Sequence, residues 1–257
     1  MRGRDVTIGG NLLASAIAYR LFLWMLPFAL VLSAGLGFLR AASEQNPNEA
    51  AQDLGLSAYV ASVVSDAADQ AERSRWIVLT IGLWALFVAS SAGAKTFTAV
   101  HGLVWGDSMI RTGSRAKAAG GFMVCLLAAL LIALVAQVAR RESPGLGITV
   151  TVAVFVAYVG LALLVSILLP HADAPWTHLL PGAVFAAFGF QVVHLVTVFY
   201  LSEKVTKSSA LYGGLGAAAT ILLWLYLIGR LVVGSAVINA TLWERAKERR
   251  ALDAGTG

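Results

Sequence analysis

The sequence predicts an all-α polytopic membrane protein with six transmembrane helices and an amphipathic extracytoplasmic helical loop. Of the 257 residues, 58% are hydrophobic and only 13% are charged, whereas a soluble domain carries about 25% charged residues. The apolar residues also form runs long enough to cross a hydrocarbon layer of roughly 30 Å, which takes about 20 helical residues. The composition therefore excludes a soluble globular domain, and we expect a single membrane domain over residues 1–257.

Six apolar runs are the expected spans. The first run is longer than the core of a cleavable signal peptide, so we expect it to remain as a span. None of the runs shows the alternation of apolar and polar residues that the roughly 10-residue strands of an outer-membrane barrel have. The spans are therefore expected to be helices, at residues 12–39, 76–94, 118–139, 146–169, 179–201 and 211–243.

Small residues and one proline indicate how these helices are shaped and packed. Pro27 lies in the middle of the first run, where a missing backbone N–H is expected to kink the helix. Ala14 and Ala18 in the first run, and Gly214 and Ala218 in the last, have the small-x-x-x-small spacing that permits close approach of two helices. We expect tight helix contacts at both places.

The segment 40–75 is the largest region outside the spans. Asn46 followed by Pro47 is typical of a helix start, and Gly55 is expected to end that short helix. Apolar residues then recur from Leu56 to Ala67 at three- and four-residue spacing, which predicts an amphipathic helix. A solvated connector and a lid over a substrate site are both compatible with this pattern.

Basic residues set the expected orientation. Seven lie on the side of the 40–75 loop, and ten lie on the side of the two termini. We therefore expect both termini in the cytoplasm. The ten residues are Arg2, Arg4, Lys95, Arg111, Arg115, Lys117, Arg245, Lys247, Arg249 and Arg250.

Two arginines inside the spans are the strongest candidates for function, because a charge in a membrane span is costly. Arg20 is roughly 12 Å into the first span and Arg230 roughly 20 Å from Trp243, at 1.5 Å per residue. No span contains an aspartate or glutamate, and the nearest aromatic neighbours along each helix are Trp24 and Tyr226. The arginines either bind an anionic group, for which guanidinium is well shaped, or extend toward lipid headgroups.

Few other polar residues in or near the spans could carry chemistry. Gln191 and His194 share one face of the fifth run, where they could line a polar path or make interhelical hydrogen bonds. His171, Asp173 and His178 lie in the preceding loop, but the prolines between them do not favour a compact metal site. We expect no metal.

Catalytic motifs are missing from the sequence. There is no Gly-x-Ser-x-Gly elbow, no phosphate-binding loop and no pair of intramembrane carboxylates. Cys125 is the one cysteine, so no disulfide forms within the chain, and His101 is interpreted as an interface residue. The net charge of +5 is scattered along the flanks of spans, which does not indicate nucleic acid. We expect neither a cofactor nor an enzyme.

Several motifs resemble the YihY/BrkB family of bacterial inner-membrane proteins. They are the segment 210–217, with the sequence Ala-Leu-Tyr-Gly-Gly-Leu-Gly-Ala, the segment 222–227, Gly234 to Asn239, Pro181-Gly182-Ala183, and Ala16 to Tyr19 continuing through Pro27. The resemblance covers most of the chain and is weakest over residues 118–160. The chain departs from the family pattern at Arg20 and at His101-Gly102.

This resemblance implies a six-span protein of the bacterial cytoplasmic membrane with cytoplasmic termini. Members are described as envelope-integrity or serum-resistance factors, and a YhjD-like branch is associated with export of lipopolysaccharide precursors. The family was once labelled as a ribonuclease, but this sequence has four dispersed histidines and no metal-ligand cluster to match that label. The family supplies no catalytic residue to carry over.

The leading hypothesis is an envelope-integrity protein that binds or translocates an anionic lipid or a lipid-linked envelope precursor. Its expected partners are membrane lipids, and its candidate site residues are Arg20, Arg230, Trp24, Tyr226, Gln191 and His194. The alternative is a structural or scaffolding component of an envelope complex without transport activity. A homo-oligomer is compatible with either function.

Overall fold

The computed structural model describes residues 9–42, 75–106, 115–142, 147–196 and 202–255. These ranges contain helices and no strands, so the predicted all-α class is confirmed for the described part of the chain. Most of the segment 40–75, with its expected amphipathic helix, lies outside the described residues. The helices are α2 (Gly10–Ala42), α5 (Arg75–Trp105), α6 (Arg115–Glu142), α7 (Gly147–Leu168), α8 (Trp176–Val196) and α9 (Ser202–Gly255).

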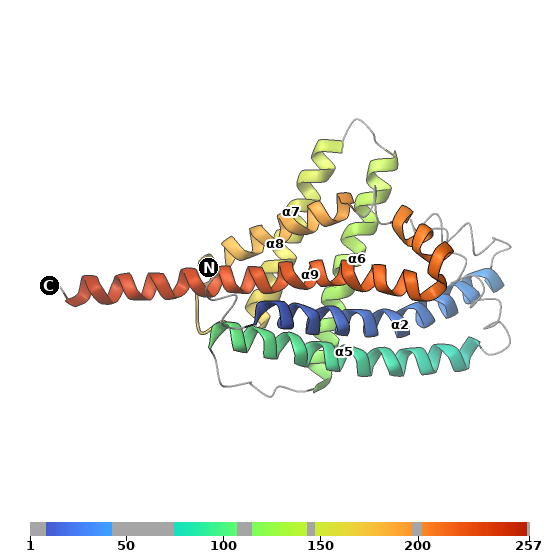
Figure 1. Ribbon diagram of the computed structural model, residues 1–257, viewed down its shortest axis with the longest axis horizontal. Coiled ribbons are helices and arrows are strands. Elements are labelled where there is room, and N and C mark those ends of the chain that lie inside the picture. Colours follow the sequence, from blue (N-terminus) through green and yellow to red (C-terminus); the bar gives the residue numbers. More distant parts are fainter. Residues whose placement is uncertain (1–8, 43–74, 107–114, 143–146, 197–201, 256–257) are drawn as a thin grey trace.

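The six helices form a closed ring of contacts. Each helix packs against the next one along the chain, and the last helix, α9, also packs against α2. A further contact joins α5 to α9. Figure 1 shows α2, α5 and α9 running side by side along the long axis of the molecule. The helix α9 therefore packs against α2, α5 and α8.

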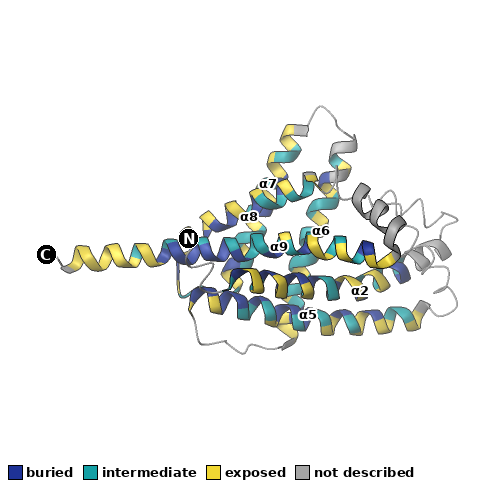
Figure 2. Cartoon of the chain, in the orientation of Figure 1, coloured by how far each residue is buried: buried dark blue, intermediate teal, exposed yellow. Residues whose placement is uncertain are grey.

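Long apolar side chains cover the outside of the bundle. Leu131 of α6 is 59% exposed and Val156 of α7 is 61% exposed, and Figure 2 shows exposed residues along the outer faces of several helices. An apolar surface of this extent is typical of a protein in contact with lipid. Each of the six helices also contains a stretch long and apolar enough to cross a membrane. These features agree with a multi-pass membrane protein.

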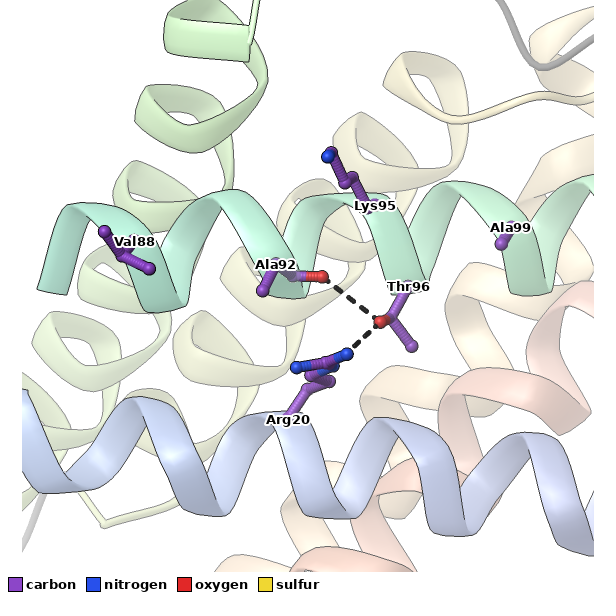
Figure 3. Close-up of a pocket in the computed structure, with 6 residues that line it drawn as sticks. All are labelled: Arg20, Val88, Ala92, Lys95, Thr96 and Ala99. Atoms are coloured by element: carbon purple, nitrogen blue, oxygen red, sulfur yellow. Dashed lines mark hydrogen bonds between the residues drawn. The ribbon is translucent and has the colours of Figure 1, made fainter. Parts of the chain in front are cut away.

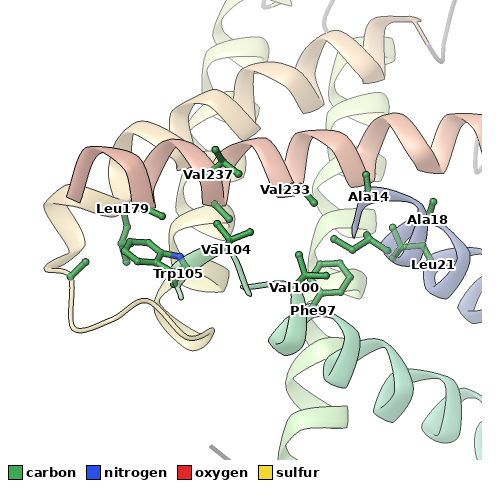
Figure 4. Close-up of a cluster of buried hydrophobic side chains, with 14 of the residues drawn as sticks. Ala14, Ala18, Leu21, Phe97, Val100, Val104, Trp105, Leu179, Val233 and Val237 are labelled. Carbon is green, nitrogen blue, oxygen red and sulfur yellow. The ribbon is translucent and has the colours of Figure 1, made fainter. Parts of the chain in front are cut away.

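The helix α5 extends beyond the run predicted at 76–94. It continues through Lys95 to Trp105, because Phe97, Val100 and Val104 of this last part are buried in the main hydrophobic cluster (Figure 4). His101 belongs to the same stretch, and its side chain is only 4% exposed. His101 is therefore packed among the helices, one turn before the end of α5.

The last helix also continues past its predicted end. Beyond Trp243, α9 runs on to Gly255, and Figure 1 shows this end projecting beyond the other helices. Lys247 and Arg250 lie over the ring of Trp243, with the Nζ and Cζ atoms 5.1 Å and 5.7 Å from its centroid. Trp243 thus marks the position where α9 passes from the buried cluster to an exposed, charged end.

The closest approach between α8 and α9 occurs at Gly182. Its backbone N–H donates to Oδ1 of Asn239 at 2.7 Å, and a Cβ added at Gly182 would overlap the carbonyl oxygen of Ser235. Asn239 is 1% exposed, so this hydrogen bond is made away from the surface. Two motifs that carry the family resemblance, Pro181-Gly182-Ala183 and Gly234 to Asn239, therefore meet at one helix crossing.

The contact between α2 and α9 depends on small residues in the same way. A Cβ added at Gly229 would overlap the carbonyl oxygen of Ala14, and Ala14 and Ala18 are both buried, as their spacing predicts. Gly214, which was expected at such a contact, is exposed instead. The prediction of tight packing was therefore right for α2 and wrong for the position in α9.

We predict that Gly182→Ala destabilises the protein by about 1 to 3 kcal/mol, because the added methyl group overpacks the crossing of α8 and α9. The melting temperature in detergent measures this effect. Gly160→Ala in α7 is the matched control, since a Cβ there meets no atom within 4 Å. The control should gain stability by up to about 1 kcal/mol, because alanine favours a helix over glycine. Equal melting temperatures for the two variants would contradict the close contact.

Candidate functional site

A groove between α2 and α5 holds one of the predicted arginines. Its volume is about 440 Å³, and it is lined by Arg20, Val88, Ala92, Lys95, Thr96 and Ala99. Figure 3 shows the guanidinium of Arg20 lying between the two helices, beside Thr96. The remaining lining residues all come from α5. In the groove, the side chain of Arg20 from α2 therefore faces a lining that α5 alone supplies.

The side chain of Arg20 is held by a hydrogen bond to the neighbouring helix. Its Nε–H donates to Oγ1 of Thr96 at 3.2 Å. The hydroxyl of Thr96 in turn donates to the carbonyl oxygen of Ala92 at 3.1 Å, which leaves a lone pair on Oγ1 to accept from the arginine. The Cζ atom of Arg20 also lies 5.9 Å from the ring centroid of Tyr19. These contacts orient the guanidinium within the groove.

Lys95 adds a second positive charge to the same groove. Its side chain is exposed, and in Figure 3 it projects from α5 on the side away from Arg20. Neither α2 nor α5 contains an aspartate or glutamate. The groove is therefore lined by two cationic residues, on a pair of helices that carry no carboxylate.

The groove lies well away from the ends of the helices that form it. Arg20 is ten residues from the start of α2 and Lys95 is ten residues from the end of α5, and each interval corresponds to roughly 15 Å of helix. The N-terminal part of α2 and the C-terminal part of α5 are adjacent, since Arg20 bonds to Thr96. Both cations therefore lie at about the same depth from one end of the bundle.

Trp24 packs between the same two helices but does not line the groove. Its indole Nε1–H donates to Oγ of Ser90 at 3.0 Å. Its ring stacks on Phe28, with 4.8 Å between the centroids. Trp24 is buried, so its role here is to fix the packing of α2 on α5 next to the site.

The two predicted residues on α9 lie elsewhere. The phenol of Tyr226 donates to Oδ1 of Asn11 at 3.2 Å, which ties α9 to the first turn of α2. Arg230 is half-buried and is not among the residues that line the groove. The structure therefore does not bring the two arginines to the one groove at Arg20.

The two predicted residues on α8 are also not among the residues that line the groove. Gln191 is 8% exposed, and neither its amide nitrogen nor its amide oxygen has a hydrogen-bond partner among the described residues. His194 is half-buried and has an interaction partner. His178 packs against Trp243 with 5.0 Å between ring centroids. Among the residues that the structure describes, no group of three possible metal ligands comes together.

Lys95 and Thr96 are the site residues that the sequence did not single out. Lys95 was counted as a loop residue, because its charge follows an apolar run. The available signal was the apolar spacing of Phe97, Val100 and Val104, which continues the helix past the lysine. No local pattern could show that Thr96 faces Arg20, since the two residues are 76 positions apart.

Several curated bacterial proteins share a segment with this chain. YfkH of Bacillus subtilis, whose name calls it ribonuclease-like, is 35% identical over 81 residues, covering 32% of this chain and 29% of that protein. A UPF0761 membrane protein of Nitrosospira multiformis is 36% identical over 76 residues, covering 30% of this chain and 18% of that protein. A UPF0761 membrane protein of Vibrio cholerae is 32% identical over 91 residues, covering 35% and 29%.

These segments span less than a third of the length of each of those three relatives. No solved structure matches the chain. The family model described as "Virulence factor BrkB" matches residues 6–256, which include all six helices and both sides of the groove. On this match across nearly its whole length, the chain belongs to the BrkB family of membrane proteins.

Proposed function

We propose that this protein binds the headgroup of an anionic lipid, or of a lipid-linked envelope precursor, in the groove between α2 and α5. The observation that carries this proposal is that Arg20 and Lys95 line the same groove, on two helices without a carboxylate. A cation at the centre of a membrane helix costs about 2.5 to 3.5 kcal/mol or more. An anionic ligand would offset that cost.

The chemistry of Arg20 favours an oxyanion as this ligand. Because Nε is engaged by Thr96, the two terminal nitrogens are the ones placed to donate to a ligand. A guanidinium can donate two parallel hydrogen bonds to two oxygens of one phosphate or carboxylate. The ammonium of Lys95 acts as a point charge without such directionality.

The surroundings of the groove favour a lipid as the source of the headgroup. Tyr19 and Val88, on the two helices that form it, are exposed on the outside of the bundle, and Trp84 continues this apolar face one turn along α5 from Val88. An acyl chain lying against that face would place its headgroup at Arg20. We further propose that the bound lipid moves across the membrane, which would give the protein a role in building the envelope.

A scaffolding role is the competing function. The close contacts at Gly182 and Gly229 show how tightly the helices pack, and a structural component of an envelope complex would need such packing. It would not need two cations in one groove. Lipid binding therefore separates the two functions.

We also propose that the protein lies in the bacterial cytoplasmic membrane with both termini in the cytoplasm. The basic residues on the side of the termini support this orientation. Lys95 no longer counts toward that bias, because it lies inside α5. The bias still includes the basic residues on the projecting end of α9, which are Arg245, Lys247, Arg249 and Arg250.

We predict that Arg20→Gln weakens binding to vesicles containing phosphatidylglycerol by at least about tenfold, since a hydrogen-bonded charge pair is worth roughly 1.5 to 3 kcal/mol. Arg20→Lys should retain part of the binding, because the charge remains without the two-point donor geometry. Purified protein titrated with anionic and with zwitterionic vesicles measures both effects.

Arg245→Gln is the matched control for this experiment. It removes an arginine that is exposed on the projecting end of α9, away from the groove. Its binding should stay within about twofold of the unmodified protein, a change of about 0.4 kcal/mol. Equal binding by the unmodified protein and Arg20→Gln would leave the scaffolding function ahead.

We predict opposite labelling for cysteines placed at Ser57 and Ser114 in a Cys125→Ala background. With six spans, these two positions lie on different sides of the membrane. The basic residues near Ser114 are expected to keep its loop in the cytoplasm. A membrane-impermeant maleimide applied to whole spheroplasts should label the Ser57 variant, and should label the Ser114 variant only after lysis. Labelling of both before lysis would overturn the proposed topology.

A further inference from the structure

We propose that the headgroup bound in the groove ends in a phosphate monoester, in preference to a phosphodiester. This inference rests on the proposed function and adds the class of ligand. It starts from the number of charges at the site. The lining contains Arg20 and Lys95 and no acidic residue, so a ligand must supply about two negative charges to neutralise the groove.

A phosphate monoester has that charge and a phosphodiester does not. At pH 7 a monoester carries about −1.5 to −2, because its second pKa is about 6. A phosphodiester has a single ionisable proton and carries one negative charge. Only the monoester therefore supplies a countercharge for both cations of the groove.

The side chain of Arg20 is fixed and that of Lys95 is free to move, so the two cations can contact a ligand one after the other. Arg20 is oriented by Thr96, whose hydroxyl is itself tied to Ala92, so its guanidinium is positioned before the ligand arrives. Lys95 is exposed at the rim, and Figure 3 shows its side chain turned away from the guanidinium. Its flexible four-carbon stem lets the ammonium turn toward a phosphate held by Arg20.

The small residues next to Thr96 leave space for such a group. Ala92 and Ala99 line the groove on α5, one before and one after Lys95 and Thr96 along the helix (Figure 3). Their methyl side chains do not compete with the ligand for the donors. The groove volume of about 440 Å³ admits either phosphate class, so charge and not size makes the distinction.

The test compares phosphatidic acid, a monoester, with phosphatidylglycerol, a diester, at equal mole fractions in otherwise identical vesicles at pH 7.5. The unmodified protein should bind phosphatidic acid about fivefold more tightly, the change expected for one added charge pair at about 4 Å in a water-like dielectric. Lys95→Gln should reduce this preference to less than about twofold, while Arg20→Gln should weaken binding of both lipids. Lys117→Gln, which removes an exposed lysine of α6 outside the groove, should keep the preference.

A second arm lowers the pH. Between pH 7.5 and pH 5 the monoester regains its second proton and falls toward one negative charge, because its second pKa is about 6. The preference for phosphatidic acid should therefore decline as the pH falls, while binding of phosphatidylglycerol stays constant. A preference that is unchanged at pH 5 would overturn the role of the second charge.

Free phosphate is the other source of the same chemistry. Inorganic phosphate added to the vesicles should displace phosphatidic acid only weakly, since it lacks an acyl chain to lie against α5. Displacement at concentrations equal to the lipid would overturn the lipid as the source.

The two proposals fail differently. Equal affinity for the two lipids, with binding still lost in Arg20→Gln, would overturn the monoester and keep the lipid site. Binding that survives in Arg20→Gln would overturn the lipid site itself. Melting temperatures of the variants in detergent, matched to the unmodified protein, establish that each variant is folded.

Discussion

Close backbone contact along α9 is the constraint on which the rest of the structure depends. In lipid the hydrophobic effect does not drive helices together, and association relies on tight van der Waals packing and interhelical hydrogen bonds. Gly182 and Gly229 allow α8 and α2 to approach within a distance that a methyl group would prevent, and Asn239 adds a hydrogen bond at the first crossing. Because α9 is held on both sides, the ring of helices closes and α2 is placed against α5. The hydrogen bond between Arg20 and Thr96 is a consequence of that placement.

The contact between α2 and α5 differs from the contacts of α9, because it is made partly by polar groups. Trp24 donates to Ser90, and Arg20 donates to Thr96 one to two turns further along α5. Each donor is paired across the interface, which avoids the cost of an unsatisfied polar group in an apolar medium. A threonine hydroxyl orients a guanidinium without neutralising it. The pairing therefore fixes the geometry of Arg20 while its charge remains available to an anion.

The sequence predicted the helices well because the membrane imposes the same requirement on every span: all backbone polar groups must be satisfied within a helix. It failed at the end of α5, where Lys95 was assigned to a loop although Phe97 and Val100 bury the following turn. It found Arg20, since a charge inside an apolar run is visible in the sequence alone. It could not find Thr96, because which residues of α2 and α5 face each other is decided by packing. The same limit explains Gly214, which has the spacing of a packing glycine and yet is exposed.

The residues that carry the family resemblance are mostly the residues that hold the helices together. Pro181-Gly182-Ala183 and the segment Gly234 to Asn239 meet at the crossing of α8 and α9, and Ala18 is buried in the contact of α2 with the bundle. Membership of the BrkB family is therefore informative about how the helices pack, and less informative about what the protein binds. Arg20, in contrast, lies in the groove and not at this crossing. The contacts that hold the helices together are therefore separate from the charges in the groove, so a substitution at Arg20 tests binding without touching the crossing of α8 and α9.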